Sequence, residues 1–369
     1  MNMDVLLAAL VEQKGSDLFI TVDAPPTLKV NGRLAPLGGS PLDKQAALAL
    51  VRESLDEAHF ERYLHTREAN YAIHREGLGR FRVSAFWQQD LPGMVLRRIE
   101  TRIPTFEELT LPSILQEVAM AKRGLVLFVG ATGAGKSTTQ AAMIGYRNQH
   151  GDGHILTVED PVEFVHQHGR CLVTQREVGI DTDSFDVALK NSMRQAPDVI
   201  LIGEIRTQET MELAIQFAET GHLCLATLHA NNANQALDRI LHLVPEAKHR
   251  QFLFDLSFNL RAIVAQQLLP SVNGSRRIAA FEILLNTPLI TDIIRKGEMH
   301  RLKEVMTKSG ELGMQTFDQA LFTLFCAGQI GYSEALAHAD SANDLRLLIK
   351  LSGREQLGAG TLDNVTLDE

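Results

Sequence analysis

The sequence predicts an α/β protein, and three observations support this fold class. Short apolar runs alternate with helical stretches from residue 125 onward, which is typical of a largely parallel sheet covered by helices on both faces. A glycine-rich segment directly follows the first run. The chain has 369 residues, 45% of them hydrophobic, which suffices for a substantial core in each of two domains. The apolar runs lie at 125–129, 155–158, 199–202 and 223–227.

Residues 1–100 are expected to form a smaller α+β domain that precedes this core. The dipeptide Asn31-Gly32 indicates a tight hairpin turn. Apolar side chains alternate at Phe81, Val83 and Ala85, as in a half-buried strand. The other expected elements are an amphipathic helix over 3–13, a strand over 17–22, a hairpin over 28–34, a helix over 46–55, a turn at Pro92-Gly93 and a strand over 94–99.

The rest of the chain divides by composition. Residues 101–112 contain two prolines and are expected to be a linker, and residues 113–285 to be the core. Residues 286–352 are expected to be helical. Residues 353–369 carry too few apolar side chains to pack and are expected to be disordered.

Composition narrows the class of protein. The net charge of −9 argues against a protein that wraps along nucleic acid, so no nucleic-acid partner is expected. Three widely separated cysteines offer neither a disulfide framework nor a CxxC zinc site. No signal peptide is recognised, and no apolar run approaches the ~18 residues that span a bilayer. These observations predict a cytoplasmic protein, for which any association with a membrane must go through partner proteins.

A phosphate-binding loop is the strongest motif in the chain. Residues 130–137 match the pattern G-x-x-x-x-G-K-[ST], after an apolar strand and before a helical segment. Backbone N–H groups and Lys136 are expected to hold the phosphates of ATP, and the Ser137 hydroxyl to bind Mg²⁺. An ordinary glycine-rich turn is the alternative, but it gives no reason for the lysine and serine. The expected nucleotide-binding residues are Gly130, Ala131, Thr132, Gly133, Ala134, Gly135, Lys136, Ser137 and Thr138.

Acidic residues follow two of the apolar strands. Glu204 comes just after the run 199–202, which is the placement of a Walker B acid at the carboxyl edge of a sheet. It is expected to hold Mg²⁺ through water or to orient the attacking water. Glu159, Asp160 and Glu163 follow the run 155–158, and one of them is expected to position water toward the γ-phosphate. For each acid the alternative is a solvated residue at a strand end.

Two histidines flank the last apolar strand. His222 precedes the run 223–227 and His229 follows it. His229 at least is expected to reach the sheet edge that carries the phosphate loop. A histidine with a core or surface role is the default for either residue alone, and the nearby phosphate loop argues for a role in the site.

The order of the motifs resembles that of the secretion ATPase superfamily, the hexameric motors of type II secretion and type IV pili. These motifs are GATGAGKS, LTVEDPVE, PDVILIGEIR, ETGHLCLATLHA and NLRAIVAQQLLP. The likeness is strongest to the type IV pilus retraction ATPases of the PilT and PilU family, and it includes GSDLFI, GRFRVSAF and GMQTFDQAL. It implies a RecA-like P-loop ATPase core, a PAS-like N-terminal domain and a homo-hexamer that hydrolyses ATP with Mg²⁺ for pilus retraction and twitching motility.

The resemblance also assigns roles to residues. The last glutamate of LTVEDPVE is the catalytic one in this family, which is Glu163 here, and Glu204 is the Walker B acid. His222 and His229 fall in the family's His box, which senses or couples the nucleotide state.

Two arginines match positions from which the PAS-like domain reaches phosphates in this family. They are Arg82 in GRFRVSAF and Arg97 in VLRRI. An arginine there adds positive charge where the transition state gathers negative charge. The alternative for each is a solvated arginine on a strand.

The sequence departs from the family pattern in three places. Thr207 stands where the family has an aspartate, and Asp90 stands where it has an arginine. Residues 287–297 replace the retraction motif near the C-terminus with a more apolar segment. The third departure favours a PilU-like member that acts beside a PilT-like paralogous motor and an inner-membrane platform protein.

Three other functions compete with a retraction motor. A pilus assembly or secretion ATPase ranks second, because such proteins carry a larger N-terminal extension and paired CxxC motifs that this sequence lacks. A noncatalytic adaptor that binds ATP and docks onto a paralogous motor belongs to another class, and the retained Lys136, Glu163, Glu204 and both histidines argue against lost catalysis, though not against a helper role. A DNA-translocating motor needs a basic channel, which the acidic composition does not favour.

Overall fold

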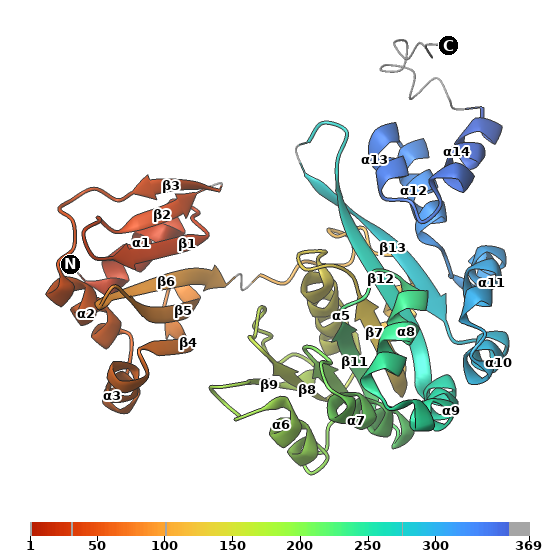
Figure 1. Cartoon of the computed structure of the whole chain (residues 1–369), viewed down its shortest axis with the longest axis horizontal. Coiled ribbons are helices and arrows are strands. Elements are labelled where there is room, and N and C mark those ends of the chain that lie inside the picture. The colour runs from red at the N-terminus through yellow and green to blue at the C-terminus, as the bar shows by residue number, and fades with distance from the viewer. Residues whose placement is uncertain (1, 31, 100–101, 275, 354–369) are drawn as a thin grey trace. The chain divides into compact units, whose positions relative to one another are not determined.

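Figure 1 shows the computed structural model of the chain, in which residues 2–30, 32–99, 102–274 and 276–353 are described. Residues 354–369, for which the sequence predicts disorder together with Gly353, lie outside the described residues. Contacts divide the chain into two compact units. The domain boundaries expected from the sequence stay predictions. The first unit comprises Met1–Ile103, Val162–His166 and Glu177–Asp183, and the second comprises Pro104–Pro161, Gln167–Arg176 and Ser184–Glu369.

An antiparallel sheet of six strands, in the order β3-β2-β1-β6-β5-β4, forms the first unit together with helices α1, α2 and α3. The alternating residues Phe81, Val83 and Ala85 are buried in its core, as the sequence predicts. Each helix begins at an Asn or Asp side chain that accepts a backbone N–H of the first turn. The bounds are α1 Met3–Glu12, β1 Asp17–Thr21, β2 Thr27–Val30, β3 Arg33–Pro36, α2 Lys44–Glu53, α3 Glu57–Thr66, β4 Glu68–Arg75, β5 Gly79–Gln88 and β6 Leu91–Ile99.

The turn expected at Pro92-Gly93 is wrong. Both residues lie inside β6, where they pair with Trp87 and Phe86 of β5. The hairpin turn lies earlier, at Gln89 and Asp90, which have φ angles of 49° and 61°. A Cβ atom on Gly93 would lie 3.1 Å from the Phe86 ring, so this glycine permits close packing of the sheet rather than a turn.

The second unit contains a seven-stranded sheet in the order β13-β12-β7-β11-β10-β8-β9. Strands β12, β7, β11, β10 and β8 pair in parallel, and β13 is antiparallel to β12. The four apolar runs are confirmed as β7, β8, β10 and β11, and the α/β fold class is thereby confirmed. The strand bounds are β7 Gly124–Val129, β8 Gly153–Glu159, β9 Cys171–Glu177, β10 Val199–Ile202, β11 Leu223–Leu228, β12 Leu260–Pro270 and β13 Arg277–Leu285.

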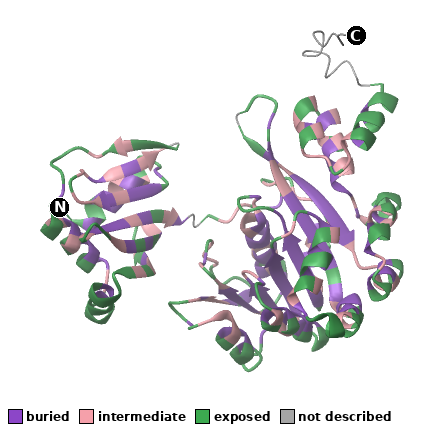
Figure 2. Cartoon of the chain, viewed as in Figure 1, coloured by how far each residue is buried: buried purple, intermediate pink, exposed green. Residues whose placement is uncertain are grey.

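Strands β7, β10 and β11 are buried along their whole length, as Figure 2 shows for the centre of this sheet. Burial on both faces explains why their sequences are continuous apolar runs rather than alternating ones. Because these strands are parallel, the residues that follow them gather at one edge of the sheet. That edge therefore holds the phosphate loop and the polar residues that follow β8, β10 and β11.

Helices accompany this sheet and continue to the end of the described chain. Helix α7 packs on β7 and β11, and α12 packs on β13, α13 and α14. None of the described helices is long and apolar enough to cross a membrane. The bounds are α4 Ile114–Ala119, α5 Lys136–His150, α6 Phe185–Ser192, α7 Gln208–Glu219, α8 Ala233–Leu243, α9 His249–Asn259, α10 Pro288–Lys296, α11 Leu302–Lys308, α12 Phe317–Cys326, α13 Tyr332–Ala337 and α14 Ala342–Leu351, with short 3-10 turns at Glu246–Lys248, Met299–Arg301 and Gly310–Leu312.

Candidate functional site

The phosphate loop joins the end of β7 to the start of α5. Its three glycines have positive φ angles of 148° at Gly130, 79° at Gly133 and 88° at Gly135. A Cβ atom would lie 2.5 Å from the carbonyl oxygen of Gln266 at Gly130, and 2.8 Å from the Gln266 amide nitrogen at Gly135. Backbone conformation disfavours a larger residue at both positions, and at Gly130 the backbone of Gln266 also leaves no space for one.

Lys136 is held inside this loop. Its side chain is 8% exposed, and its Nζ atom donates hydrogen bonds to the carbonyl oxygens of Gly130, at 2.8 Å, and Ala131, at 2.9 Å. The ammonium group is therefore fixed at the start of α5, where the positive end of the helix also favours an anion. This cradle fits the phosphates of a nucleotide.

Buried amide side chains that the sequence analysis did not single out support the loop. Gln266 in β12 accepts a hydrogen bond from Thr139 at 2.8 Å, and Gln140 in α5 accepts one from Thr227 at 3.2 Å. Gln266 and Gln140 are at most 5% exposed. The sequence offers one sign of such a role for Gln266, because Gln266 and Gln267 interrupt the otherwise apolar segment of β12.

Two cavities border the phosphate loop. One of about 410 Å³ combines Thr138 with the apolar side chains of Leu109, Leu111 and Ile278 and with Arg277. Its apolar walls and cationic rim fit a nucleobase beside phosphates.

The other cavity, of about 450 Å³, is lined by Gly130–Ala134 together with Asn231, Gln267 and His338. It brings the loop after β11 and the C-terminal helices to the phosphate loop. The largest cavity described, of about 740 Å³, lies elsewhere, at the beginnings of β7 and β12.

Glu204 and His229 are brought together at the carboxyl edge of the sheet. The Nε2 atom of His229 lies 3.0 Å from Oε1 of Glu204, and the Nε atom of Arg206 donates to Oε2 of Glu204 at 2.7 Å. The hydrogen bond to Glu204 raises the pKa of Arg206. The Glu204 carboxylate is therefore held in a fixed orientation, from which it can act on a water or a hydrated cation.

Backbone hydrogen bonds join the ends of three strands around Glu204. Gly203 donates to the carbonyl of Val158 at 2.8 Å, and Ile205 donates to the carbonyl of Thr227 at 2.8 Å. Glu159 lies at the end of β8, where its carboxylate accepts from Thr157 at 2.7 Å. Asp160, the next residue, is exposed.

His222 is not brought to this edge. It precedes β11, and its carbonyl accepts from Gly124 at the beginning of β7. Its Nδ1 atom lies 3.1 Å from both the Phe217 carbonyl and the Thr220 hydroxyl. A strand of six residues, about 20 Å long, separates it from His229. Its packing at the opposite end of the strand fits a structural role better than contact with phosphate.

Glu163 and the two arginines belong to the first unit, whereas the phosphate loop belongs to the second. Glu163 is exposed in the segment 162–166. Arg82 and Arg97 are exposed cross-strand neighbours on β5 and β6. Arg97 donates to Asp17 at 2.7 Å. The catalytic roles expected for Glu163, Arg82 and Arg97 stay predictions.

Glu177, which the sequence analysis did not single out, links the Glu163 segment to the arginine strand. Its Oε2 atom accepts from Arg80 of β5 at 3.0 Å and from the backbone N–H of Val162 at 3.2 Å. Burial raises the pKa of Glu177, and Arg80 opposes this effect. Within the first unit, Glu177 therefore positions the segment that carries Glu163 against the strand that carries Arg82.

The departures from the family pattern keep local structure intact. Thr207 caps α7, since its hydroxyl accepts the Thr210 N–H at 3.2 Å, a task that aspartate also performs. Asp90 occupies the hairpin turn and pairs with Arg67 at 2.8 Å. Thr287 caps α10, and Gly297 ends it with a φ angle of 74°. The altered C-terminal segment is thus a complete helix.

Comparisons with known proteins agree with this fold. Residues 76–313 match the model of a family described as type II/IV secretion system protein. The chain is 62% identical over 351 residues to the type IV pilus ATPase PilU of Pseudomonas aeruginosa, covering 95% of this chain and 92% of that protein. It is 38% identical over 335 residues to the type IV pilus retraction ATPase PilT of the same organism, covering 91% and 97%.

A solved structure has the same fold over nearly the whole chain. The crystal structure of the pilus retraction motor PilT with bound ADP aligns with a TM-score of 0.88 at 35% identity, covering 94% of this chain and 98% of that one. The expected P-loop ATPase fold is thereby confirmed. With a family match over residues 76–313 and 62% identity across 95% of its length, this chain belongs to the type II/IV secretion system protein family.

Proposed function

We propose that this chain is a PilU-like motor ATPase that hydrolyses ATP to drive type IV pilus retraction together with a PilT-like paralogue. The observation that carries the proposal is the position of the Glu204–His229 pair at the same sheet edge as a complete phosphate loop. This arrangement combines a phosphate cradle with a fixed carboxylate, which are the parts that ATP hydrolysis needs. The identity to the pilus ATPase PilU supports the mechanical task.

The second unit binds ATP and Mg²⁺ in this proposal. Residues 130–138 enclose the phosphates, and Lys136 exchanges its hydrogen bonds to loop carbonyls for bonds to β- and γ-phosphate oxygens. The Ser137 hydroxyl and Glu204 would hold Mg²⁺, and the cation would supply positive charge beside the phosphate oxygens. The cavity next to Thr138 receives the nucleobase.

Hydrolysis and movement follow from the remaining residues. Glu163 positions the attacking water as general base, and His229 senses the nucleotide through Glu204. In a homo-hexamer, Arg82 and Arg97 of one subunit add positive charge to the site of its neighbour. Turnover then changes the joints between subunits around the ring. The protein works in the cytoplasm, at an inner-membrane platform protein of the pilus machine.

ATP turnover by the purified full-length chain tests the enzymatic claim. Wild-type protein with ATP and Mg²⁺ is expected to release phosphate, and Lys136→Ala is expected to lose both binding and turnover. Equal rates for the two proteins would show that the measured activity is not that of this site. Sedimentation with ATP and Mg²⁺ tests the ring, which a monomer with full activity would exclude.

A deletion strain tests the mechanical claim. Excess pili together with lost surface motility is the result expected of a retraction motor. Absence of pili would instead indicate an assembly motor. Complementation with Glu204→Gln, which is expected to bind ATP without turnover, separates a catalytic contribution from an adaptor role, because an adaptor that binds ATP needs no turnover.

A further inference from the structure

A buried carboxylate lies between the nucleotide edge of the sheet and the C-terminal helices. Glu282 is in β13 and is 0% exposed. It pairs in register with Ala265 of β12, which in turn pairs with Val129, the last residue before the phosphate loop. No sequence motif marks this residue, and the proposed ATP hydrolysis does not use it.

Helix α8 begins at Glu282, whose Oε1 atom accepts the backbone N–H of Ala233, the first residue of α8, at 2.8 Å. The Oε2 atom of Glu282 is buried and has no hydrogen-bond partner among the described residues. The backbone N–H of Phe317, the first residue of α12, favours the charged form of this carboxylate and lowers its pKa, against the larger effect of burial. Both helices therefore direct the positive ends of their dipoles toward Glu282, but only α8 is hydrogen-bonded to it.

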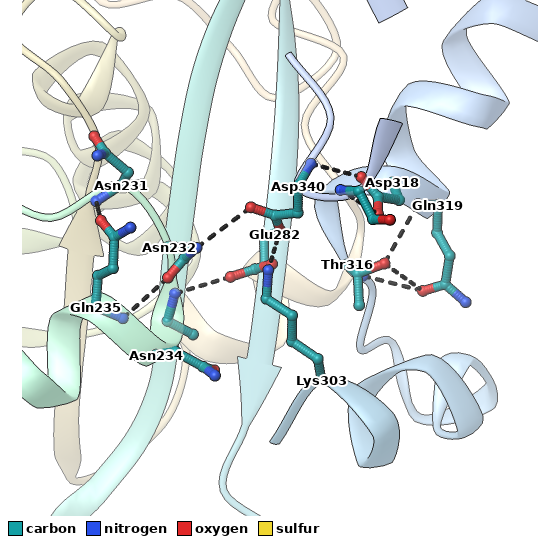
Figure 3. Close-up of polar contacts among 12 residues, drawn as sticks. Asn231, Asn232, Asn234, Gln235, Glu282, Lys303, Thr316, Asp318, Gln319 and Asp340 are labelled. Carbon is teal, nitrogen blue, oxygen red and sulfur yellow. Dashed lines mark hydrogen bonds and ion pairs between the residues drawn. The ribbon is translucent and has the colours of Figure 1, made fainter. Parts of the chain in front are cut away.

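A second connection runs beside the first. The Nδ2 atom of Asn232, the N-cap of α8, donates to Asp340 at 3.3 Å. Asp340 precedes α14 and also pairs with Lys303 of α11. Its backbone N–H donates to Asp318 of α12 at 2.8 Å. Figure 3 shows these groups converging on Asn232 and Glu282 from α11, α12 and the segment before α14.

The loop that enters α8 carries the residues that can respond to nucleotide. It begins at His229, whose Nε2 atom lies 3.0 Å from Glu204, and continues through Asn231, which lines the cavity at the phosphate loop. It ends at Asn232, which bonds Asp340 before α14, and at Ala233, which bonds Glu282 of β13. A shift at His229 would therefore reach Asp340, whose backbone N–H is bonded to Asp318 of α12.

We propose that Glu282 is a positioning residue that couples the nucleotide site to helices α12 to α14, by bonding the N-terminal end of α8 with a buried carboxylate that also faces the N-terminal end of α12. The Asn232–Asp340 hydrogen bond makes the same connection from the side of α14. This inference rests on the proposed function, in which the nucleotide state is converted into movement. It assigns the C-terminal helices as the element that receives the signal.

Amide hydrogen exchange of the full-length chain tests the coupling directly. Wild-type protein with Mg²⁺ and either ADP or a nonhydrolysable ATP analogue is expected to show different exchange rates in α12 and α14. Glu282→Gln keeps an oxygen for the Ala233 N–H but removes the charge that both helix ends share. We expect it to bind both nucleotides within about twofold of wild type, to lose the exchange difference, and to lower kcat about fivefold or more at little changed KM.

Asn232→Asp breaks the second connection without removing the helix cap. An aspartate still accepts the Gln235 N–H, but it faces the Asp340 carboxylate with an oxygen instead of a donor. Adding Asp340→Asn restores a hydrogen bond with donor and acceptor exchanged, and is expected to recover part of the exchange difference. This pair keeps the test decisive if Glu282→Gln does not fold.

Glu304→Gln is the matched control, because Glu304 is an exposed residue of α11 paired only with Lys308 among the interactions described for it. It is expected to behave as wild type. Two outcomes would overturn the coupling: a wild-type chain whose α12 and α14 exchange equally with both nucleotides, or Glu282→Gln and Asn232→Asp variants that keep the difference and full turnover. A chain that shows the exchange difference but hydrolyses no ATP would retain the coupling and refute the ATPase instead.

Discussion

The Nε2 atom of His229 lies 3.0 Å from the Oε1 atom of Glu204, although the two residues follow different strands. Their strands β10 and β11 are parallel, with Ile202 in register with Ala226. The two side chains therefore leave the sheet at the same edge. Arg206 donates to the other carboxylate oxygen of Glu204. The carboxylate therefore cannot turn away from His229 without also breaking its hydrogen bond to Arg206.

Glu204→Gln and His229→Ala are each expected to reduce kcat by about 10²–10⁴-fold while ATP still binds. The loss follows because the carboxylate acts on water or Mg²⁺ in the reaction and His229 fixes its orientation. Phosphate release and fluorescent-nucleotide binding measure the two quantities separately. The double variant is expected to be little worse than Glu204→Gln alone, since both residues act through one group.

His222→Ala provides the comparison within the same strand. His222 contacts Phe217 and Thr220 at the far end of β11, so its removal is expected to change stability more than kcat. A loss of kcat as large as that of His229→Ala, in a variant that melts like wild type, would contradict this assignment.

Gly130→Ala is expected to destabilise the second unit and to abolish nucleotide binding. The added Cβ atom would lie 2.5 Å from the Gln266 carbonyl oxygen, which is backbone and cannot rotate away. Gly133→Ala is the matched control, because its φ angle is also positive but no atom lies within 4 Å of the added Cβ. We expect Gly130→Ala to lose about 1–3 kcal/mol more unfolding free energy than Gly133→Ala in denaturant titrations. Similar losses would mean that backbone conformation, and not the contact with β12, sets the requirement.

Local patterns predicted the parts of the fold that depend on neighbours in sequence. Continuous apolar runs identified β7, β8, β10 and β11, because strands buried on both faces have no polar side. Helix α3 has a weaker pattern, since its buried residues are only Phe60 and Tyr63. The Pro92-Gly93 dipeptide has the composition of a turn. The structure instead requires a glycine at position 93 because the Phe86 ring packs closely against it.

The site divides in the same way. The phosphate loop is a continuous segment, so its residues and its structure follow from one motif. Gln266 and Glu282 act on segments more than 45 residues away, and no local pattern reveals such a partner. Of the two histidines, the sequence already favoured His229 for this edge because it follows the strand, and the direction of β11 places His222 at the other end.

Replacing Arg82 and replacing Arg97 are expected to change thermal stability differently. Two arginines directly opposite each other repel across an antiparallel pair, so a fold selected for stability alone has no use for both. Arg82→Gln is expected to leave thermal stability equal to or slightly above that of wild type while reducing ATP turnover about 10³-fold or more, if the residue acts on phosphate. Arg97→Gln removes the partner of the buried Asp17 and is expected to lower stability as well. Full turnover in Arg82→Gln would contradict the role proposed for this arginine.

Glu282 gives stability an unusual dependence on pH. Burial raises the pKa of Glu282 from 4.5 to about 7; repulsion from Asp340 adds to this effect, whereas the Ala233 and Phe317 N–H groups and Lys303 oppose it. The folded chain therefore binds this proton more tightly than the unfolded chain does. The contribution of this group to stability is fully present below pH 4.5 and is lost as the pH rises through 7. The loss is on the order of 3 kcal/mol.

Glu282→Gln removes this titration and isolates its contribution. The unfolding free energy of wild type minus that of the variant is expected to fall as the pH rises from about 5 to about 8, because only the wild-type chain must bury a charge at the higher pH. Denaturant titrations of both proteins at several pH values measure the difference. Glu304→Gln should show little change over this range, since Lys308 lowers the pKa of Glu304 from 4.5 and the contribution of that pair is lost only as the pH falls below this value. A difference for Glu282→Gln that does not change with pH would mean that its carboxylate keeps one protonation state throughout, and the coupling between α8 and α12 would then be independent of pH.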